Sequence, residues 1–370
     1  MEHGDPNPTQ IERRARSTSR YRFRSVSGRI TVSLNHYLQA RAHAGQRSFC
    51  ALRHCHINKG KIDIFITLKT AHHVVWPNVV FFILVHLGSL YGIYLIFTKA
   101  KWQTLVFTYF MYIVSNTGMT AGVHRLWAHK AYKAKLPLKI LLVLMSTIGF
   151  QGSVHQWVRD HRVHHKYSET DADPHNATRG FFFSHIGWLL MKKHPEVTAK
   201  GHDIDMSDLR ADKLICLQKK YYYPLVLLLC FITPTVIPLL WGEEIWTAFF
   251  VAGILRYTFS LHTIFLVNSL AHMWGTKPYD KRMKPAETKS VSFLACGEGF
   301  HNYHHVFPWD YKAAEMGGYA LNISRLFIDT MAKIGWAYDL KTVTEATLKR
   351  RIIRTGDGTH PSLLKENDSF

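Results

Sequence analysis

Four long blocks of apolar residues constrain the fold of this chain more than any other feature. They cover residues 79–97, 102–123, 221–241 and 246–267, so each is 19 to 22 residues long. A helix of about 20 residues is about 30 Å long, which matches the hydrocarbon core of a bilayer. Very short spacers, TKAK and GEE, separate the blocks within each pair. The sequence therefore predicts an all-α membrane protein whose four transmembrane helices form two hairpins entering the bilayer from one side.

A fifth apolar stretch, residues 136–154, allows two interpretations. If it crosses the bilayer, the histidines on its two sides face opposite compartments, whereas a stretch lying in the interface keeps them in one. The segment 124–220 carries sixteen Lys and Arg against nine Asp and Glu, which favours the cytosolic side. We interpret 136–154 as interfacial and expect 180–196 also to lie on the membrane. The segments between the hairpins then form a helical cytosolic cap.

The two ends of the chain differ in composition from the region between them. We divide the chain into an N-terminal tail at 1–70, a membrane domain at 71–340 and a C-terminal tail at 341–370. Residues 1–60 carry eleven Lys and Arg against three acids, which indicates a disordered cytosolic tail or a transit peptide. The formal net charge of +20 favours an anionic membrane face or substrate, because no nucleic-acid-binding motif accompanies it. The five cysteines form no CxxC pair, which fits a reducing cytosolic face.

Four groups of histidines indicate a metal centre in the cap. They contain nine histidines and one asparagine: His124 and His129; His161, His164 and His165; Asn268 and His272; His301, His304 and His305. In each HxxHH group, positions i, i+3 and i+4 share one helix face. So many imidazoles exceed one tetrahedral site and suit two metals with open positions, and imidazole accepts iron, zinc or copper.

Other side chains near these groups have less specific interpretations. His124 and His129 differ by five residues, about 140° on a straight helix, so they reach different metals or straddle a helix end. Asp160 and Glu298 are either orienters of ligand imidazoles or surface charges. Seven further histidines are interpreted as ordinary hydrogen-bonded side chains: His72, His73, His86, His175, His185, His194 and His262.

The motifs HRLWAH, HRVHHK and HNYHH, in that order and with NSLAH between the last two, resemble the membrane-bound acyl-CoA desaturases. The resemblance covers about residues 76–340 and is closest to the insect-like acyl-CoA Δ9, or stearoyl-CoA, type. It implies two iron ions (Fe2+), O2 as co-substrate, and electrons from cytochrome b5 and an NADH-dependent reductase. It also implies an endoplasmic reticulum membrane protein with several spans and cytosolic termini, which inserts a cis double bond into a saturated fatty acyl-CoA.

Carried onto this sequence, the resemblance also assigns site residues. The nine histidines named above become iron ligands, with Asn268 acting through a water. The implied substrate-binding residues are Asn78, Arg159, Asp160, Lys192, Lys193, Gln151, Trp157 and Tyr112. Tyr112 and Asn116 fall where the family sets chain length, and Asn116 either shortens the pocket or faces another helix.

The chain departs from the family pattern beside the implied acyl tunnel and at no ligand position. Gly152 stands where an Asn is common, and Ile264 and Phe265 stand where Thr-Trp is usual. We therefore expect intact metal chemistry and leave three functions open. The first is a desaturase, of Δ9 or another, pheromone-type regiospecificity. The others are a hydroxylase on the same di-iron scaffold and a non-catalytic metal- or lipid-binding relative.

Overall fold

The computed structural model describes residues 73–367 and, before them, three short strands at 30–33, 55–58 and 61–64. The chain divides into two compact units, Met1–His72 and His73–Phe370. In the first unit β1 (Ile30–Ser33), β2 (Cys55–Asn58) and β3 (Lys61–Ile64) form an antiparallel sheet in the order β1-β3-β2. The rest of the predicted N-terminal tail lies outside the described residues, so the alternatives of disorder and a transit peptide remain predictions.

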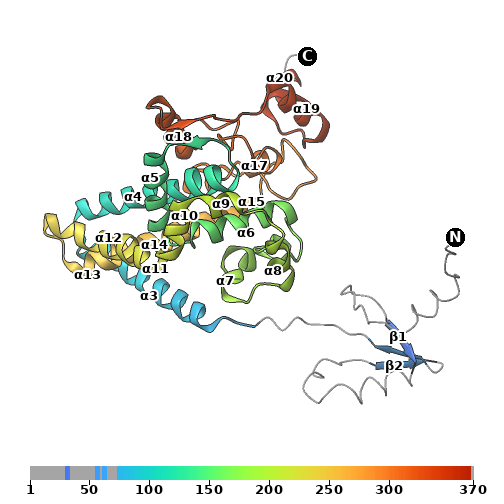
Figure 1. Ribbon diagram of the computed structural model, residues 1–370, viewed down its shortest axis with the longest axis horizontal. Helices are drawn as coiled ribbons and strands as arrows, with labels where there is room; N and C mark the ends of the chain where they lie inside the picture. Colours follow the sequence, from blue (N-terminus) through green and yellow to red (C-terminus); the bar gives the residue numbers. More distant parts are fainter. Residues whose placement is uncertain (1–29, 34–54, 59–60, 65–72, 368–370) are drawn as a thin grey trace, which may run out of the picture. The chain divides into compact units, whose positions relative to one another are not determined.

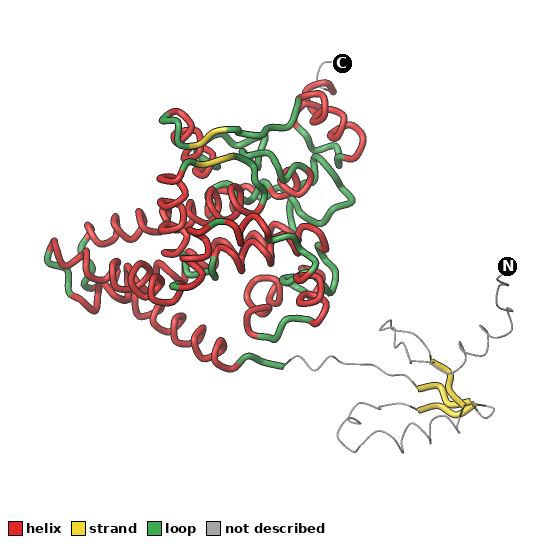
Figure 2. The backbone as a smooth tube through the Cα atoms, viewed as in Figure 1, coloured by secondary structure: helices red, strands yellow, loops and turns green. Residues whose placement is uncertain are grey.

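The second unit is mostly helical (Figures 1 and 2). Three of its helices are long and apolar enough to cross a membrane: Trp76–Thr98, Tyr222–Trp241 and Ile245–Met273. The first is α3 (Trp76–Thr98). The second consists of α11 (Tyr222–Val226), η4 (Leu227–Ile232), α12 (Thr233–Val236) and η5 (Ile237–Trp241). The third consists of α13 (Ile245–Ala248), η6 (Phe249–Leu255), α14 (Arg256–Asn268) and α15 (Leu270–Met273).

The second apolar block of the sequence behaves differently from the other three. It forms α4 (Trp102–Thr117) and then continues as a π-helix, η1 (Gly118–Ala128), which carries His124 beyond the apolar block. This helix is not among the three long apolar ones. Three of the four predicted spans therefore correspond to helices of spanning length, and the arrangement of four spans in two hairpins remains a prediction.

The ambiguous stretch 136–154 contains the short helix α5 (Leu136–Ile148). Its 13 residues make a helix about 20 Å long, which is shorter than the hydrocarbon core of a bilayer. One face of α5 packs against η1, with Leu138 and Leu142 fully buried. At this crossing the two backbones touch: a Cβ on Gly118 would lie 2.4 Å from the carbonyl carbon of Met145.

The cap contains the remaining elements, and two short strands in it depart from the all-α prediction. The helices between α5 and the second long apolar helix are α6 (Val154–Tyr167), η2 (Ala177–Arg179), η3 (Phe183–Gly187), α7 (Trp188–Leu190), α8 (Pro195–His202), α9 (Ser207–Ala211) and α10 (Lys213–Lys220). Those after α15 are α16 (Lys289–Leu294), α17 (His301–Val306), α18 (Ile323–Lys333), α19 (Glu345–Thr355) and α20 (Pro361–Asn367). The strands β4 (Lys133–Ala134) and β5 (Ala337–Tyr338) pair antiparallel.

The C-terminal segment packs onto the cap behind α17. Ile352 of α19 belongs to a buried cluster with Tyr279, Tyr303 and Phe307, and Tyr303 and Phe307 come from α17 and the residue that follows it. His360 places its Nε2 atom 3.0 Å from Glu315 Oε2. The last helices of the chain therefore support the histidine-bearing helix α17 from the side away from its histidines.

The close approach of η1 and α5 gives the first testable prediction. Gly118→Ala should destabilise the protein by about 2 kcal/mol, because the added methyl meets backbone atoms that cannot rotate away. Gly253→Ala is the matched control, since a Cβ there would lie 3.7 Å from its nearest neighbour, the Thr235 hydroxyl. Thermal unfolding of the detergent-solubilised proteins measures both. Equal melting temperatures for the two variants would contradict the backbone contact.

Candidate metal centre

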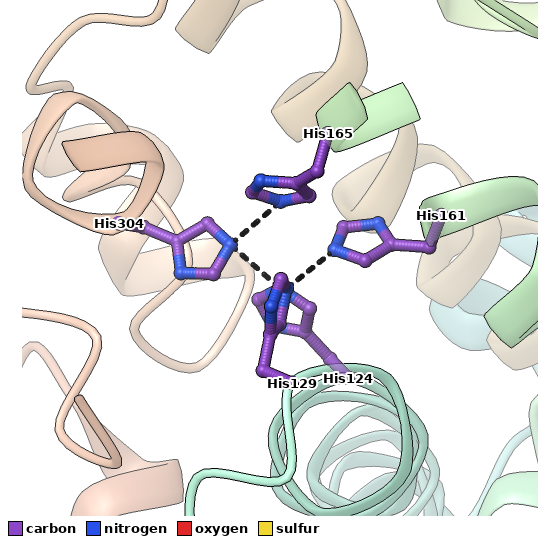
Figure 3. A group of neighbouring side chains, drawn as sticks. All are labelled: His124, His129, His161, His165 and His304. Carbon is purple, nitrogen blue, oxygen red and sulfur yellow. Dashed lines mark hydrogen bonds between the residues drawn. The ribbon is translucent and has the colours of Figure 1, made fainter. Parts of the chain in front are cut away.

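The nine predicted histidines come together in two groups. The first histidine group contains His124, His129, His161, His165 and His304. The second histidine group contains His164, His272, His301 and His305. Within each group one nitrogen of every ring lies within 4.8 Å of the others. Figure 3 shows the rings of the first group directed toward one another from separate parts of the chain.

The two HxxHH helices link the groups, because each contributes to both. In α6, His161 and His165 lie in the first group and His164 in the second. In α17, His304 lies in the first group and His301 and His305 in the second. Side chains at positions i and i+4 of a helix point in nearly the same direction, while the side chain at i+3 is rotated from them. The histidines of one helix can therefore reach two neighbouring sites. The spacing itself therefore places the two groups side by side.

His124 and His129 share the first group, and the expectation that they reach different metals on a straight helix is wrong. The alternative, a helix end, is correct, since His129 is the residue that caps η1. The amide of His129 donates to the carbonyl of His124 at 3.1 Å. This i to i+5 bond is the π-helical pattern, which brings residues five apart onto one side.

Carboxylates hold the outer nitrogen of three of these rings. The Nδ1 atom lies 2.8 Å from Glu298 in His124, 2.9 Å from Asp173 in His164 and 3.0 Å from Glu169 in His272. The other nitrogen, Nε2, faces a neighbouring histidine at about 3.0 Å in His124 and His272. A carboxylate at Nδ1 and an Nε2 directed toward the other imidazoles form the usual arrangement of histidines that bind metals.

Sequence reasoning found one of these acids and missed two. Glu298, which the sequence left open between an orienter and a surface charge, is buried against the His124 ring. Asp160, left open in the same way, contacts Arg159 and Lys193. Glu169 and Asp173 lie in the loop after α6, whose reversal toward the histidines leaves no periodic signal in the sequence. The only available signal was three acids within nine residues of a histidine cluster, of which Glu169 and Asp173 contact the rings and Asp171 does not appear among their partners.

The electrostatics favour neutral imidazoles, the form that binds metal. Burial, followed by the neighbouring histidines, lowers the pKa of His129, His161 and His301 well below its usual value. The same holds for the other four members with a resolved shift: His164, His165, His304 and His305. Burial alone raises the pKa of Glu298, but Arg125 and then His124 overcome it and hold the pKa at about 2. Convergent neutral imidazoles backed by carboxylates fit two divalent metal ions.

A cavity of about 600 Å³ leads to the histidines. Five of the predicted substrate residues line it: Asn78, Gln151, Trp157, Asp160 and Lys193. A second, small cavity of about 30 Å³ lies against members of both histidine groups. The two cavities share Trp157, His161, Ile264 and Asn268, so the large one ends where the metal centre begins.

The other predicted site residues lie at different places. Asn268 lines both cavities. Arg159 binds Asp160 at 2.9 Å, and Lys192 precedes the cavity residue Lys193. Tyr112 donates its hydroxyl hydrogen to the carbonyl of Leu294 and lines neither cavity.

Two positions that the sequence left open are also resolved. The side chain of Asn116 faces a helix, because its amide donates to Thr263 of α14 at 3.1 Å. The departures Gly152, Ile264 and Phe265 all line the large cavity.

Comparisons with known proteins agree with this geometry. The family model for fatty acid desaturases matches residues 100–314. The chain is similar to an acyl-CoA Delta-9 desaturase of Acheta domesticus, with 59% identity over 78% of this chain and 80% of the relative. It is 53% identical to an acyl-CoA Delta(11) desaturase of Spodoptera littoralis over 81% of this chain and 89% of the relative. An acyl-CoA Delta12-desaturase of Acheta domesticus is 54% identical over 78% and 81% of the two chains.

The division into two groups predicts the metal stoichiometry of single variants. His165→Ala removes a ring of the first group and His272→Ala a ring of the second. Each should lower the metal content of the purified protein by about one ion per chain, because each centre loses a ligand while the other is intact. Inductively coupled plasma mass spectrometry measures this. Full metal content in either variant would mean that the removed ring is not a ligand.

The carboxylate that contacts His124 gives a further prediction. Glu298→Gln should weaken metal binding about 10- to 100-fold, because an uncharged amide has one acceptor oxygen and cannot accept from both the His124 ring and the Arg125 guanidinium, as the two carboxylate oxygens do. Glu196→Gln, which changes an exposed acid on α8, is the control. Competition with a chelator of known affinity compares the two. Equal retention of metal in both variants would contradict an orienting role for Glu298.

Proposed function

The chain belongs to the fatty acid desaturase family, and from that premise we propose that it inserts a cis double bond into a saturated fatty acyl-CoA. Membership of this family makes it an oxidoreductase. The bond is placed at Δ9, O2 is the co-substrate, and the two electrons come from cytochrome b5 and its NADH-dependent reductase. The proposal rests on the two histidine groups and on the cavity beside them.

The observation that best supports the proposal is the continuity between the cavity and the histidines. An acyl chain is long, narrow and without charge, so it needs a deep apolar cavity that passes the oxidising centre. Phe81, Phe82, Leu261 and Phe265 give the large cavity such a wall, and Asn268 lies where it meets the small one. A volume of about 600 Å³ is in the range of cavities that enclose a ligand of this size.

We assign the nine histidines as ligands of two iron ions, with Asn268 acting through a water. When bound, the iron ions supply with O2 the oxidising power that unactivated C–H bonds require. The protein's own part is to hold the imidazoles neutral and oriented and to exclude water from the acyl chain. Glu169, Asp173 and Glu298 orient the rings, and the aromatic wall of the cavity excludes water.

The cations that line the cavity suit the CoA head group. Lys193 and Lys219 line the cavity together with Asn78 and Asp160, and Lys193 is paired with Asp160. Lys192 and Arg159 are next to Lys193 and Asp160 in the sequence and add positive charge. Phosphate groups pair strongly with such cations. We therefore assign these residues to the head group and Gln151 and Trp157, which also line the cavity, to the acyl chain.

The three helices of spanning length support a membrane location, and we extend this to four spans in two hairpins. The second block, α4 and the start of η1, supplies the fourth. With the basic segment 124–220 in the cytosol, the histidine groups face the electron donor. The proposed location is the endoplasmic reticulum, with both termini cytosolic.

The position of the double bond is the least constrained part of the proposal. The relatives carry the names Delta-9, Delta(11) and Delta12 at similar identities. Ile264 and Phe265, which depart from the family pattern, both line the acyl cavity. This observation favours a desaturase of another regiospecificity as the second candidate. A hydroxylase and a non-catalytic relative remain as outcomes of the experiment below.

Expression in a desaturase-deficient yeast tests the proposal, because the host supplies acyl-CoA, cytochrome b5 and O2. The wild-type chain should restore monounsaturated fatty acids, and mass spectrometry of derivatised lipids should place the bond at Δ9. His301→Ala should abolish the product while the protein stays in the membrane fraction, since it removes a proposed ligand. A hydroxylated product would favour the hydroxylase. Unchanged lipids despite membrane expression and bound iron would contradict an enzymatic function.

A further inference from the structure

Three histidines that lie outside the metal centre form a continuous chain of hydrogen bonds. His86 of α3 places its Nε2 atom 2.9 Å from Nε2 of His262 in α14. The other ring nitrogen of His262, Nδ1, lies 2.9 Å from Nε2 of His185 in η3. The His185 Nδ1 atom then lies 3.0 Å from the Ser269 hydroxyl, at the end of α14. We call these four residues the histidine chain.

The histidine chain differs from the metal groups in its geometry. In those groups one nitrogen of each ring converges on a common point. Here His262 uses both ring nitrogens, on opposite edges of the ring, so the three imidazoles lie in series. A series of this kind offers no common point for an ion, and it joins α3, α14 and η3 to one another.

The ends of the histidine chain fix the direction of its hydrogen bonds. His86 Nδ1 lies 2.5 Å from the carbonyl of Phe82, and a carbonyl only accepts, so this nitrogen carries the hydrogen. With neutral rings, His262 then donates from Nε2 to His86, and His185 donates from Nε2 to His262. The Ser269 hydroxyl has a single hydrogen and lies 2.9 Å from the carbonyl of Phe265 as well as 3.0 Å from His185. Every ring nitrogen has a partner when that hydrogen is directed to His185. Burial lowers the pKa of His185, which agrees with neutral rings.

A second polar network holds α14 from another side. Ser260 donates to the side chain of Asn116 in α4, and Asn116 donates to Thr263 at 3.1 Å. At 100° per residue, Ser260 and Thr263 lie on one sector of α14, and His262 and Ser269 lie on another. The third sector holds Leu261, Ile264, Phe265 and Asn268, which line the acyl cavity. Polar contacts on two sides thus fix the rotation of α14 about its axis.

We propose that the histidine chain holds α14 in the rotation that aligns the acyl cavity with the metal centre, and that His262 is a positioning residue for double-bond position. The proposal rests on the proposed desaturase function. His262 does not line either cavity, and its neighbours Leu261 and Phe265 do. A rotation of α14 would move Ile264, Phe265 and Asn268 together. It would thereby change which carbon of the acyl chain lies nearest the histidines. In an apolar environment an unpaired ring nitrogen is costly, which is why the chain resists such a rotation.

The test expresses three α14 variants in the desaturase-deficient yeast and measures the ratio of double-bond positions in the products. His262→Leu removes both links and should raise the share of minor positions about threefold or more, because a shift of about 1 Å at the reacting atoms changes rates by up to about 100-fold. His262→Gln, whose amide can donate to His86 and accept from His185, should restore most of the wild-type ratio. Thr258→Val is the matched control, since the Thr258 hydroxyl bonds only to Ile254 of the same helix.

The outcomes separate this proposal from the proposed function. A wild-type protein that makes no unsaturated product contradicts the desaturase function. If the wild-type protein makes product and His262→Leu makes the same ratio of double-bond positions, the positioning role is overturned and the desaturase function is not. If His262→Leu fails to accumulate, Ser269→Ala replaces it, because it removes the last link of the histidine chain together with a bond to the carbonyl of Phe265 within the same helix, and it should shift the ratio in the same direction. An unchanged ratio in Ser269→Ala then overturns the proposal.

A labelling experiment that does not depend on catalytic turnover completes the test. Ile264→Cys places a thiol in the cavity wall, and its reaction with N-ethylmaleimide, quantified by peptide mass spectrometry, reports the rotation of α14. Adding His262→Leu should change the labelling rate at position 264 several-fold, whereas adding Thr258→Val should not. Equal rates in all three proteins would overturn the proposal even if no product were formed.

Discussion

The buried ion pair between Arg125 and Glu298 is the interaction on which the metal centre depends. Arg125 is 1% exposed, and its guanidinium lies 2.9 Å from Glu298, whose other oxygen lies 2.8 Å from His124. The same guanidinium donates to the carbonyls of Tyr311 and Lys312 and to the side chain of Asn322. A buried charge is stable only when it is paired and hydrogen-bonded. The pair therefore connects η1, which carries His124, to the residues just before α17.

This connection explains how residues far apart in the sequence form a single site. The first histidine group draws on η1, α6 and α17, and the second on α6, α15 and α17. Here η1 continues α4, and α15 ends the long apolar helix Ile245–Met273. Helices α6 and α17 are too short to be stable alone, so their positions come from packing on the rest of the fold and from buried polar contacts. The backbone contact at Gly118 fixes η1 against α5, and Ile352 of α19 packs in the cluster that supports α17.

The sequence predicts those parts of this arrangement that depend on period and length. Residues three and four apart share a helix face, so HRVHH and HNYHH predict convergent rings, and blocks of 19 to 22 apolar residues predict spanning helices. It does not predict the π-helical end that brings His124 and His129 together, because π and α turns have no distinct composition. Nor does it predict Glu169, Asp173 or the partners of His262, which depend on how a loop reverses or how a helix is rotated.

Two elements belong both to the histidine groups and to the wall of the large cavity. Helix α6 carries three of the histidines and also Trp157 and Asp160, and its histidines are held by neighbouring rings and by Asp173. On the helix Ile245–Met273, Ile264 and Phe265 line the cavity only a few residues before His272 of the second histidine group. A movement of this helix changes the cavity wall relative to the centre without removing a ligand. Proteins similar to this chain carry three different double-bond positions in their names, and a helix shared by wall and centre is a physical means of varying that position.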